Sequence, residues 1–190
     1  RIKAPKGYDW ITEERGSFGE FLQNTKLKKT GSQILDFRQN PISNQSEHVA
    51  IMDYDIGEKD LQQCADAVMR LRAEYLFAQN QFDKIHFNFT NGFRVDFVKW
   101  AQGNRIKVQG NNTSWYKAFE KEDYSYLNFK AYMEQIFQYA GTFFQPQFFC
   151  GSHQNRIGTR ELSYFEHIIF LGSHNSTIFL AVRKNPDYYI

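Results

Sequence analysis

The clearest hydrophobic pattern in the chain lies between residues 58 and 79. Apolar side chains recur there at intervals of three and four residues, at Leu61, Cys64, Ala65, Val68, Leu71, Tyr75 and Leu76. This spacing places them on one stripe of a helix and predicts a face packed against a core. The opposite face carries Asp66, Arg70 and Glu74 four residues apart, which we interpret as a solvated surface with weak ion pairs. The pattern predicts a long amphipathic helix whose charged side faces water.

Alternating apolar and polar positions predict two antiparallel hairpins in the middle of the chain. Residues 84–90 alternate strictly, and Asn91-Gly92 follows them. An Asn-Gly pair favours a type I′ turn, in which both central residues take positive φ, so we expect residues 93–98 to return as the partner strand. Residues 105–109 form another alternating run, and residues 114–119 follow a turn rich in Gly and Asn as its expected partner.

Residue patterns typical of helix caps predict two further helices. The Ser-x-x-Glu pattern from Ser17 to Glu20 is typical of a capping box and predicts a helix of about two turns after Ser17. Residues 126–140 carry an aromatic and apolar stripe that begins after a cap at Asp123 or Ser125 and stops at the following glycine. Further strands are expected over three apolar stretches, at residues 48–56, 163–171 and 177–182. Together these elements predict an α+β fold with a central helix packed on an antiparallel sheet.

The composition indicates one folded domain and excludes several classes of protein. With 190 residues, of which 42% are hydrophobic and 23% charged, the chain suits a single domain over residues 1–190. A formal net charge of +2 is too small for a dedicated nucleic-acid binder. The apolar runs are far shorter than the ~20 residues that cross a bilayer, so we expect no membrane-spanning segment. No signal-peptide pattern opens the chain, so we expect any export signal either to precede Arg1 or not to exist.

The two cysteines, Cys64 and Cys150, are too few for a disulfide scaffold or a four-cysteine zinc site. The five histidines show no ligand spacing typical of zinc. We therefore predict no metal ion and no cofactor.

Three segments carry a family resemblance: Asp55-Ile56-Gly57, the run from Asp60 to Leu76, and His86-Phe87-Asn88-Phe89-Thr90. They resemble the domain of unknown function 4846 family of bacterial, often exported proteins. The resemblance covers residues 1–142, and it implies an exported or envelope-associated location. It names no reaction.

The end of the chain departs from that family pattern. Members typically continue with a Gly-Asp strand and a Gly-His-Ala segment, which looks like the histidine strand of papain-like, cell-wall amidases. In residues 143–190 the matching place is Glu166-His167-Ile168, where Glu166 stands in the position of glycine and Gly-Asp is missing. The resemblance therefore implies a divergent papain-like fold, with His167 as the matching histidine and a divergent C-terminal part.

A thiol hydrolase needs a cysteine that a neighbouring imidazole and a helix N-terminus convert to the thiolate. Cys64 falls in the first or second turn of its predicted helix, and His167 follows in the Cys-then-His order of papain-like enzymes. The sequence thus offers an amide hydrolase with Cys64 as nucleophile and His167 as base, acting on cell-wall peptide or glycan material. Cys64 also lies on the stripe of Leu61 and Val68, so the competing interpretation is a cysteine buried in the core.

Two other groups of polar residues are candidates for chemistry. His86 lies on the polar side of its predicted strand with Asn88 and is a second candidate base, or else a structural histidine satisfied by a neighbour. Asp53 and Asp55 share one face of the predicted strand 48–56, at a separation that suits hard-cation coordination or acid–base work. Solvated acids at a strand end explain the same pattern.

The aromatic residues support a function of another class. Flat rings could line a glycan-binding cleft, at Trp100, Trp115, Tyr116, Tyr124 and Tyr126, although most aromatic side chains in such a chain fill the core. The alternative to the hydrolase is therefore a noncatalytic envelope-associated domain that binds glycan or protein.

Overall fold

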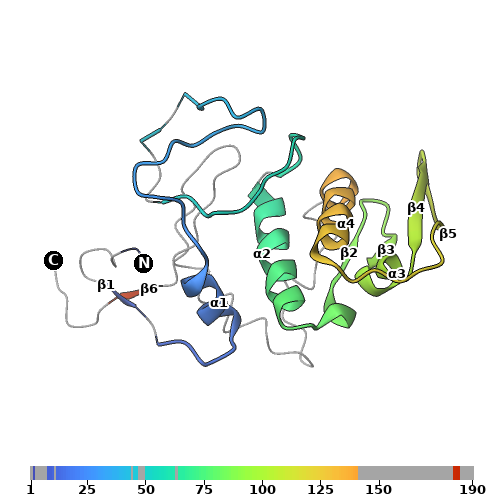
Figure 1. Ribbon diagram of the computed structural model, residues 1–190, viewed down its shortest axis with the longest axis horizontal. Coiled ribbons are helices and arrows are strands. Elements are labelled where there is room, and N and C mark those ends of the chain that lie inside the picture. The colour runs from blue at the N-terminus through green and yellow to red at the C-terminus, as the bar shows by residue number, and fades with distance from the viewer. Residues whose placement is uncertain are drawn as a thin grey trace. The chain divides into compact units, whose positions relative to one another are not determined.

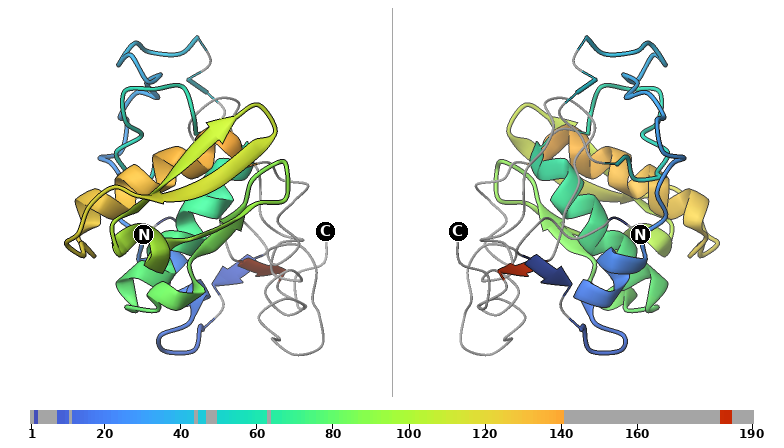
Figure 2. Two further views of the ribbon diagram at one scale, coloured as in Figure 1. Left: turned by 90° about the vertical axis from the view of Figure 1, so that its right-hand side faces the viewer. Right: turned by 90° about the vertical axis from the view of Figure 1, so that its left-hand side faces the viewer.

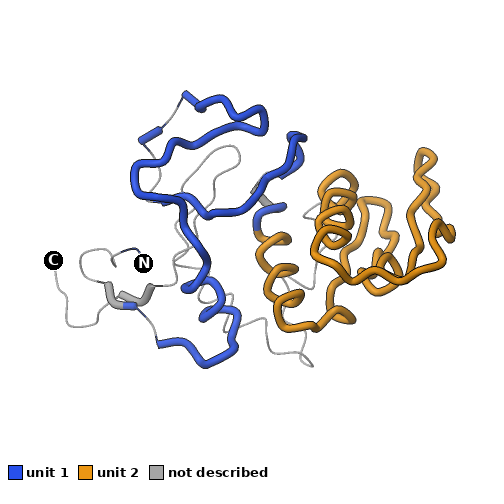
Figure 3. The backbone as a smooth tube through the Cα atoms, viewed as in Figure 1, with its two compact units in different colours: residues 1–67, 147–190 blue, residues 68–146 orange. Residues whose placement is uncertain are grey.

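The computed structural model describes residue 2 and residues 8–10, 12–43, 45–46, 50–62, 64–140 and 182–184, with side chains described for these except at 8–9, 64–65 and 182–184. The chain divides into two compact units (Figure 3). Unit 1 comprises residues 1–67 and 147–190, and unit 2 comprises residues 68–146. The boundary falls inside the helix α2, after its first turn.

The described residues of unit 1 include a short helix and a two-stranded sheet, together with the first turn of α2 (Figure 1). Strand β1 (Tyr8–Trp10) pairs antiparallel with β6 (Val182–Lys184). Helix α1 (Phe18–Asn24) follows Ser17, whose hydroxyl accepts the backbone N–H of Glu20 at 3.0 Å. The Glu20 carboxylate in turn accepts the backbone N–H of Gly16. The capped helix predicted from the Ser-x-x-Glu pattern is confirmed.

The segment between α1 and α2 is mostly irregular, and the strand predicted over 48–56 is wrong for its described part. Residues 50–57 form one bridge, between Met52 and Leu27. The backbone N–H of Lys28 donates to Ile51, and that of Asp53 donates to Lys26, each at 2.8 Å. These contacts join residues 51–53 to residues 26–28 alone, so the alternating segment 50–56 does not form a longer strand in a sheet.

Helix α2 (Cys64–Ala78) begins six residues later than the hydrophobic pattern predicts. Gly57 takes a φ of +74°, which is outside the range of a right-handed helix, so α2 cannot extend back through this residue. The N–H of Leu61 then bonds to the carbonyl of Lys59, and the Gln62 amide donates back to the carbonyl of Ile56 at 3.0 Å. Leu61 therefore lies outside the helix, although the pattern places it on the helical stripe.

Unit 2 packs helices α2 and α4 with two hairpins around an aromatic core (Figures 1 and 2). Its remaining elements follow α2 in the order η1 (Phe82–Lys84), β2 (His86–Asn88), β3 (Arg94–Asp96), α3 (Phe97–Ala101), β4 (Asn104–Gln109), β5 (Asn112–Lys117) and α4 (Tyr126–Tyr139). The rings of Phe77 on α2 and Phe129 on α4 lie 4.5 Å apart between centroids. Phe97 packs edge-on against both Phe129 and the fully buried Tyr132. These contacts place the core between the two helices and α3.

Both predicted hairpins are present, with shorter strands. β2 pairs with β3, but the returning strand ends at Asp96 because α3 starts at Phe97. Of the Asn91-Gly92 pair only Gly92 has positive φ, so the turn is not the type I′ turn expected from this pair. β4 pairs with β5 over six residues. Helix α4 begins after Ser125, which confirms one of the two predicted caps, since its hydroxyl accepts the N–H of Asn128.

Hydrogen bonds among three side chains connect the β4–β5 hairpin to α3 and α4. The side-chain oxygen of Asn128 accepts from the Trp100 indole and from the Arg105 guanidinium, each at 2.9 Å. The guanidinium carbon lies 4.0 Å from the Trp100 ring centroid and 4.8 Å from that of Phe119, between two aromatic side chains. Trp100 and Arg105 thus have a structural role.

The charged face predicted for α2 is not solvated at Arg70 and Glu74, which are 5% and 8% exposed. Their side chains form an ion pair of 2.6 Å, and the Tyr126 hydroxyl from α4 donates to the same Glu74 oxygen at 2.8 Å. The four-residue spacing correctly predicts the ion pair. It does not predict the burial, which comes from parts of the chain packed over α2.

The α+β class is confirmed. The antiparallel sheet is not one sheet beneath a central helix, because the described strands form three separate two-stranded sheets. The strand predicted over 163–171 lies outside the described residues. Of the strand predicted over 177–182 only Val182 is described, and it is the first residue of β6.

Candidate functional site

Cys64 is the first residue of α2, so its backbone stands at the N-terminus of a helix of 15 residues. The first backbone N–H groups of a helix have no partner within the helix, and the helix dipole places partial positive charge at this end. A thiol at such a position is favoured as the thiolate. The sequence pattern places Cys64 in the first or second turn of the helix, and the structure places it at the first residue, where this effect is strongest.

The segment before Cys64 is held by hydrogen bonds within itself. The Asp55 carboxylate accepts the N–H of Gly57 at 2.9 Å, and the Gln62 side chain bonds to the carbonyl of Ile56. Gln62 lies two residues before Cys64. The backbone that leads to the candidate nucleophile is therefore fixed by side chains of its own loop.

The described residues do not test the pairing of Cys64 with His167. His167 and Cys150 lie outside them, and the Cys64 side chain is not among those described. The hydrolase pair predicted from sequence stays a prediction.

A pocket of about 280 Å³ lies in unit 1, next to the segment that precedes α2. It is lined by Lys28, Leu35, Gln39, Ile51, Met52, Asp53, Tyr54, Asp55 and Ile56. Asp53 and Asp55 are not on a strand, but the structure brings both to this pocket. No sequence pattern joins them to Lys28 or Gln39, so the pocket could not be found from periodicity.

His86, the other candidate base, lies in the β2–β3 hairpin opposite Asp96. Its Nδ1 is buried, and no described residue offers it a hydrogen bond. Burial, followed by the nearby positive charge of Arg94, lowers the pKa of His86 below its ordinary value, while Asp96 and a hydrogen bond to the Lys84 backbone act in the opposite direction. A buried ring nitrogen cannot meet a substrate without movement of the hairpin. The position of His86 therefore favours the structural interpretation over catalysis.

Because the folded state resists protonation of His86, the free energy of unfolding is expected to fall as pH decreases below about 6.5. In that window the unfolded chain binds a proton that the folded ring does not, so the contribution is present above pH 6.5 and is lost as the pH falls through the lower folded pKa. His86→Leu should remove this part of the pH dependence. Urea unfolding of both proteins between pH 7.5 and 5 measures it, and equal slopes would show that His86 does not titrate in this way.

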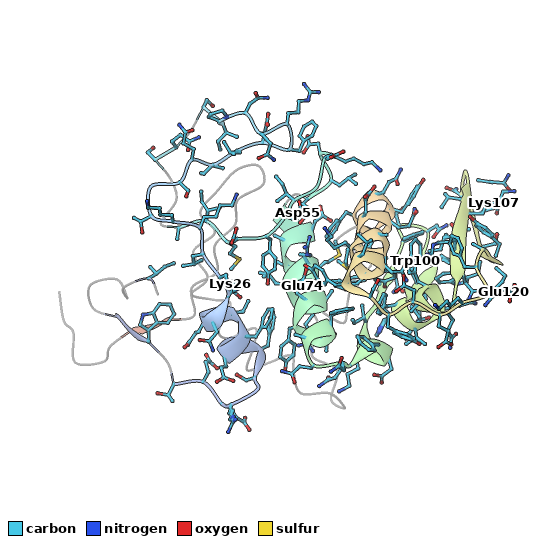
Figure 4. All side chains as sticks on the ribbon, viewed as in Figure 1. Lys26, Asp55, Glu74, Trp100, Lys107 and Glu120 are labelled. Carbon is cyan, nitrogen blue, oxygen red and sulfur yellow. The ribbon has the colours of Figure 1, made fainter. Side chains whose placement is uncertain are left out.

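The aromatic candidates fall into two groups. Trp100 is 5% exposed and belongs to the core, so it does not line a binding cleft. Tyr126 is partly exposed, but its hydroxyl is engaged by Glu74. Tyr116 on β5 and Phe119 just after it are 50% and 56% exposed. In Figure 4 Trp100 lies within unit 2, and Lys107 lies on strand β4 of the β4–β5 hairpin.

Within the described part of the chain, no helix combines the length and apolar character needed to cross a bilayer. The same residues contain no group of three or more His, Cys, Asp or Glu side chains placed to hold a metal ion.

The family model for a domain of unknown function (4846) matches residues 1–147. No curated protein and no solved structure matches the chain.

Proposed function

The chain belongs to the domain of unknown function 4846 family, and we propose that it is an exported cysteine hydrolase of papain-like type that cleaves amide bonds in cell-envelope material. Cys64 is the nucleophile and His167 the base. The position of Cys64 as the first residue of α2 carries the proposal. A helix start at this residue supplies the electrostatic setting that a reactive thiolate needs.

The chemistry follows from a thiolate and an imidazolium. The Cys64 sulfur attacks the amide carbonyl carbon, and the new C–S bond gives a tetrahedral oxyanion that backbone N–H groups at the helix start can stabilise. The C–N bond then breaks, and the imidazolium of His167 gives its proton to the leaving amine. Water then gives a proton to the imidazole and adds to the thioester carbon. The C–S bond breaks, the carboxylic acid product leaves, and the Cys64 thiolate and the imidazolium are restored.

The later start of α2 removes Leu61 from the helical stripe of Cys64, while Val68 and Leu71 stay on it. Burial of Cys64 in the core is therefore still the competing interpretation. The buried Nδ1 of His86 makes this residue a poor candidate for the base.

Covalent labelling by a peptide bearing a chloroacetamide group tests the pair. The folded wild type should be modified at Cys64, as read by mass spectrometry of proteolytic fragments. His167→Ala should slow the reaction by about tenfold or more, because a general base contributes on the order of 10²-fold or more to such steps. His86→Leu should leave it within about twofold. Equal rates for wild type and His167→Ala would contradict the assignment of the base.

A noncatalytic binding domain is the second candidate, and one observation favours it. Tyr116 and Phe119 expose half or more of their surface beside the β4–β5 hairpin. Rings exposed in this way can stack on sugar faces or pack against a protein partner. Under this alternative Cys64 resists labelling until the protein unfolds.

A further inference from the structure

The pocket of unit 1 combines apolar walls with three charged side chains. Leu35, Ile51, Met52 and Ile56 are half-buried, whereas Lys28, Asp53 and Asp55 are exposed. Among the described lining residues, two carboxylates and one ammonium group give a net negative charge. A ligand suited to these walls has an apolar stem and a positively charged end.

Both carboxylates stand on backbone that hydrogen bonds hold in place. The N–H of Asp53 donates to the carbonyl of Lys26 at 2.8 Å, within the short ladder around the Leu27–Met52 bridge. The Asp55 carboxylate accepts the N–H of Gly57. Asp55 lies on the segment that leads into α2 (Figure 4). The backbone of Asp53 and the carboxylate of Asp55 are therefore held in place before a ligand arrives, which lowers the cost of binding one.

The pocket is tied to the loop that carries the proposed nucleophile. Ile56 lines the pocket, and its carbonyl accepts the Gln62 amide at 3.0 Å. From Gln62 to Cys64 the chain spans at most about 7 Å. A group bound in the pocket therefore contacts the short chain segment that leads to the start of α2.

We propose that this pocket binds an aliphatic side chain that ends in a primary ammonium group, of the lysine or ornithine type, on the peptide cleaved by Cys64. The assignment rests on the proposed hydrolase function and names its substrate class. The methylene stem packs on the apolar walls, and the ammonium donates to the carboxylates of Asp53 and Asp55. A volume of about 280 Å³ is close to the lower limit of small-molecule pockets, about 300 Å³, and suits one side chain of a longer substrate.

Calorimetric titration of the Cys64→Ser protein at low salt tests the pocket without requiring catalysis. The probe is acetyl-alanyl-lysine amide, and its matched control is the same peptide acetylated at Nζ. The lysine peptide should bind at least about tenfold more tightly, because the carboxylates form charge-assisted hydrogen bonds only with the ammonium. Added salt should weaken this preference.

Three variants assign the binding to the pocket. Asp53→Asn/Asp55→Asn should reduce affinity for the lysine peptide by about tenfold. The exposed Asp83, in unit 2, gives a control of like charge change, and Asp83→Asn should leave the affinity unchanged. Lys28→Met removes a like charge and should tighten binding about twofold to fivefold, a gain that a damaged fold would not produce.

Equal binding of the two peptides, or an affinity that none of the pocket variants changes, would overturn the assignment. Because binding is measured on the Cys64→Ser protein, which has no thiol at this position, an unreactive Cys64 overturns the hydrolase proposal and leaves this result standing. A reactive Cys64 without preference for the lysine peptide overturns the pocket assignment alone.

Discussion

Gly103→Ala is expected to lower the free energy of unfolding of unit 2 by about 3 kcal/mol or more. Gly103 has a φ of +87°, and a Cβ built on it would overlap the backbone carbonyl of Phe119. Its own carbonyl accepts the N–H groups of Ala118 and Phe119 at 3.0 and 2.9 Å. The two segments cannot separate without losing these bonds, so the variant combines backbone strain with a steric clash.

Gly110→Ala is the matched control. Gly110 also has positive φ, +59°, but no atom lies within 4 Å of the added Cβ. Only the conformational cost applies there, about 1 kcal/mol. Urea unfolding followed by tryptophan fluorescence compares the two, since Trp100 and Trp115 lie in unit 2. Equal losses for both variants would show that the close approach of Phe119 does not matter.

Arg70→Met is expected to cost about 3–5 kcal/mol, because it leaves the buried Glu74 carboxylate without its cation. Among the described residues, Glu74 would keep the hydrogen bond from Tyr126 alone. The double variant Arg70→Met/Glu74→Leu removes both charges and should recover much of the loss.

The ion pair of Arg94 with Asp96 provides the control for that experiment. Its distance of 2.8 Å is similar, but the side chains are 56% and 36% exposed. Arg94→Met should therefore cost at most about 1 kcal/mol. A double variant no more stable than Arg70→Met, measured by urea unfolding, would contradict the importance of the unpaired buried charge.

Local signals predict the local structure well. The cap at Ser17, the cap at Ser125 and the two hairpins each depend on residues a few positions apart, and all four are present. The hydrophobic pattern places the start of α2 too early because the apolar stripe includes Leu61. The turn formed by residues 57–62 prevents the helix from starting before this point. Periodicity records which residues could share a face, and the backbone turn decides where the helix begins.

Burial and the pocket could not be predicted in the same way. Glu74 is covered in part by Tyr126, which lies 52 residues further along the chain. The pocket joins Lys28 and Leu35 to residues 51–56 through the short ladder at Met52. Contacts between residues so far apart in the chain produce no periodic pattern in the sequence. For the candidate nucleophile, sequence indicated the residue and its helix, and the structure added its place as the first residue of α2.

The rate of alkylation of Cys64 as a function of pH is the most direct test of the proposed nucleophile. Folded protein is reacted with iodoacetamide between pH 4 and 10, and Cys64→Ser serves as the blank that removes the contribution of Cys150. An activated thiolate gives a fast reaction whose apparent pKa lies well below the ordinary value of about 8.5. A thiol that reacts only after the protein unfolds would contradict the hydrolase and leave the binding domain as the function to pursue.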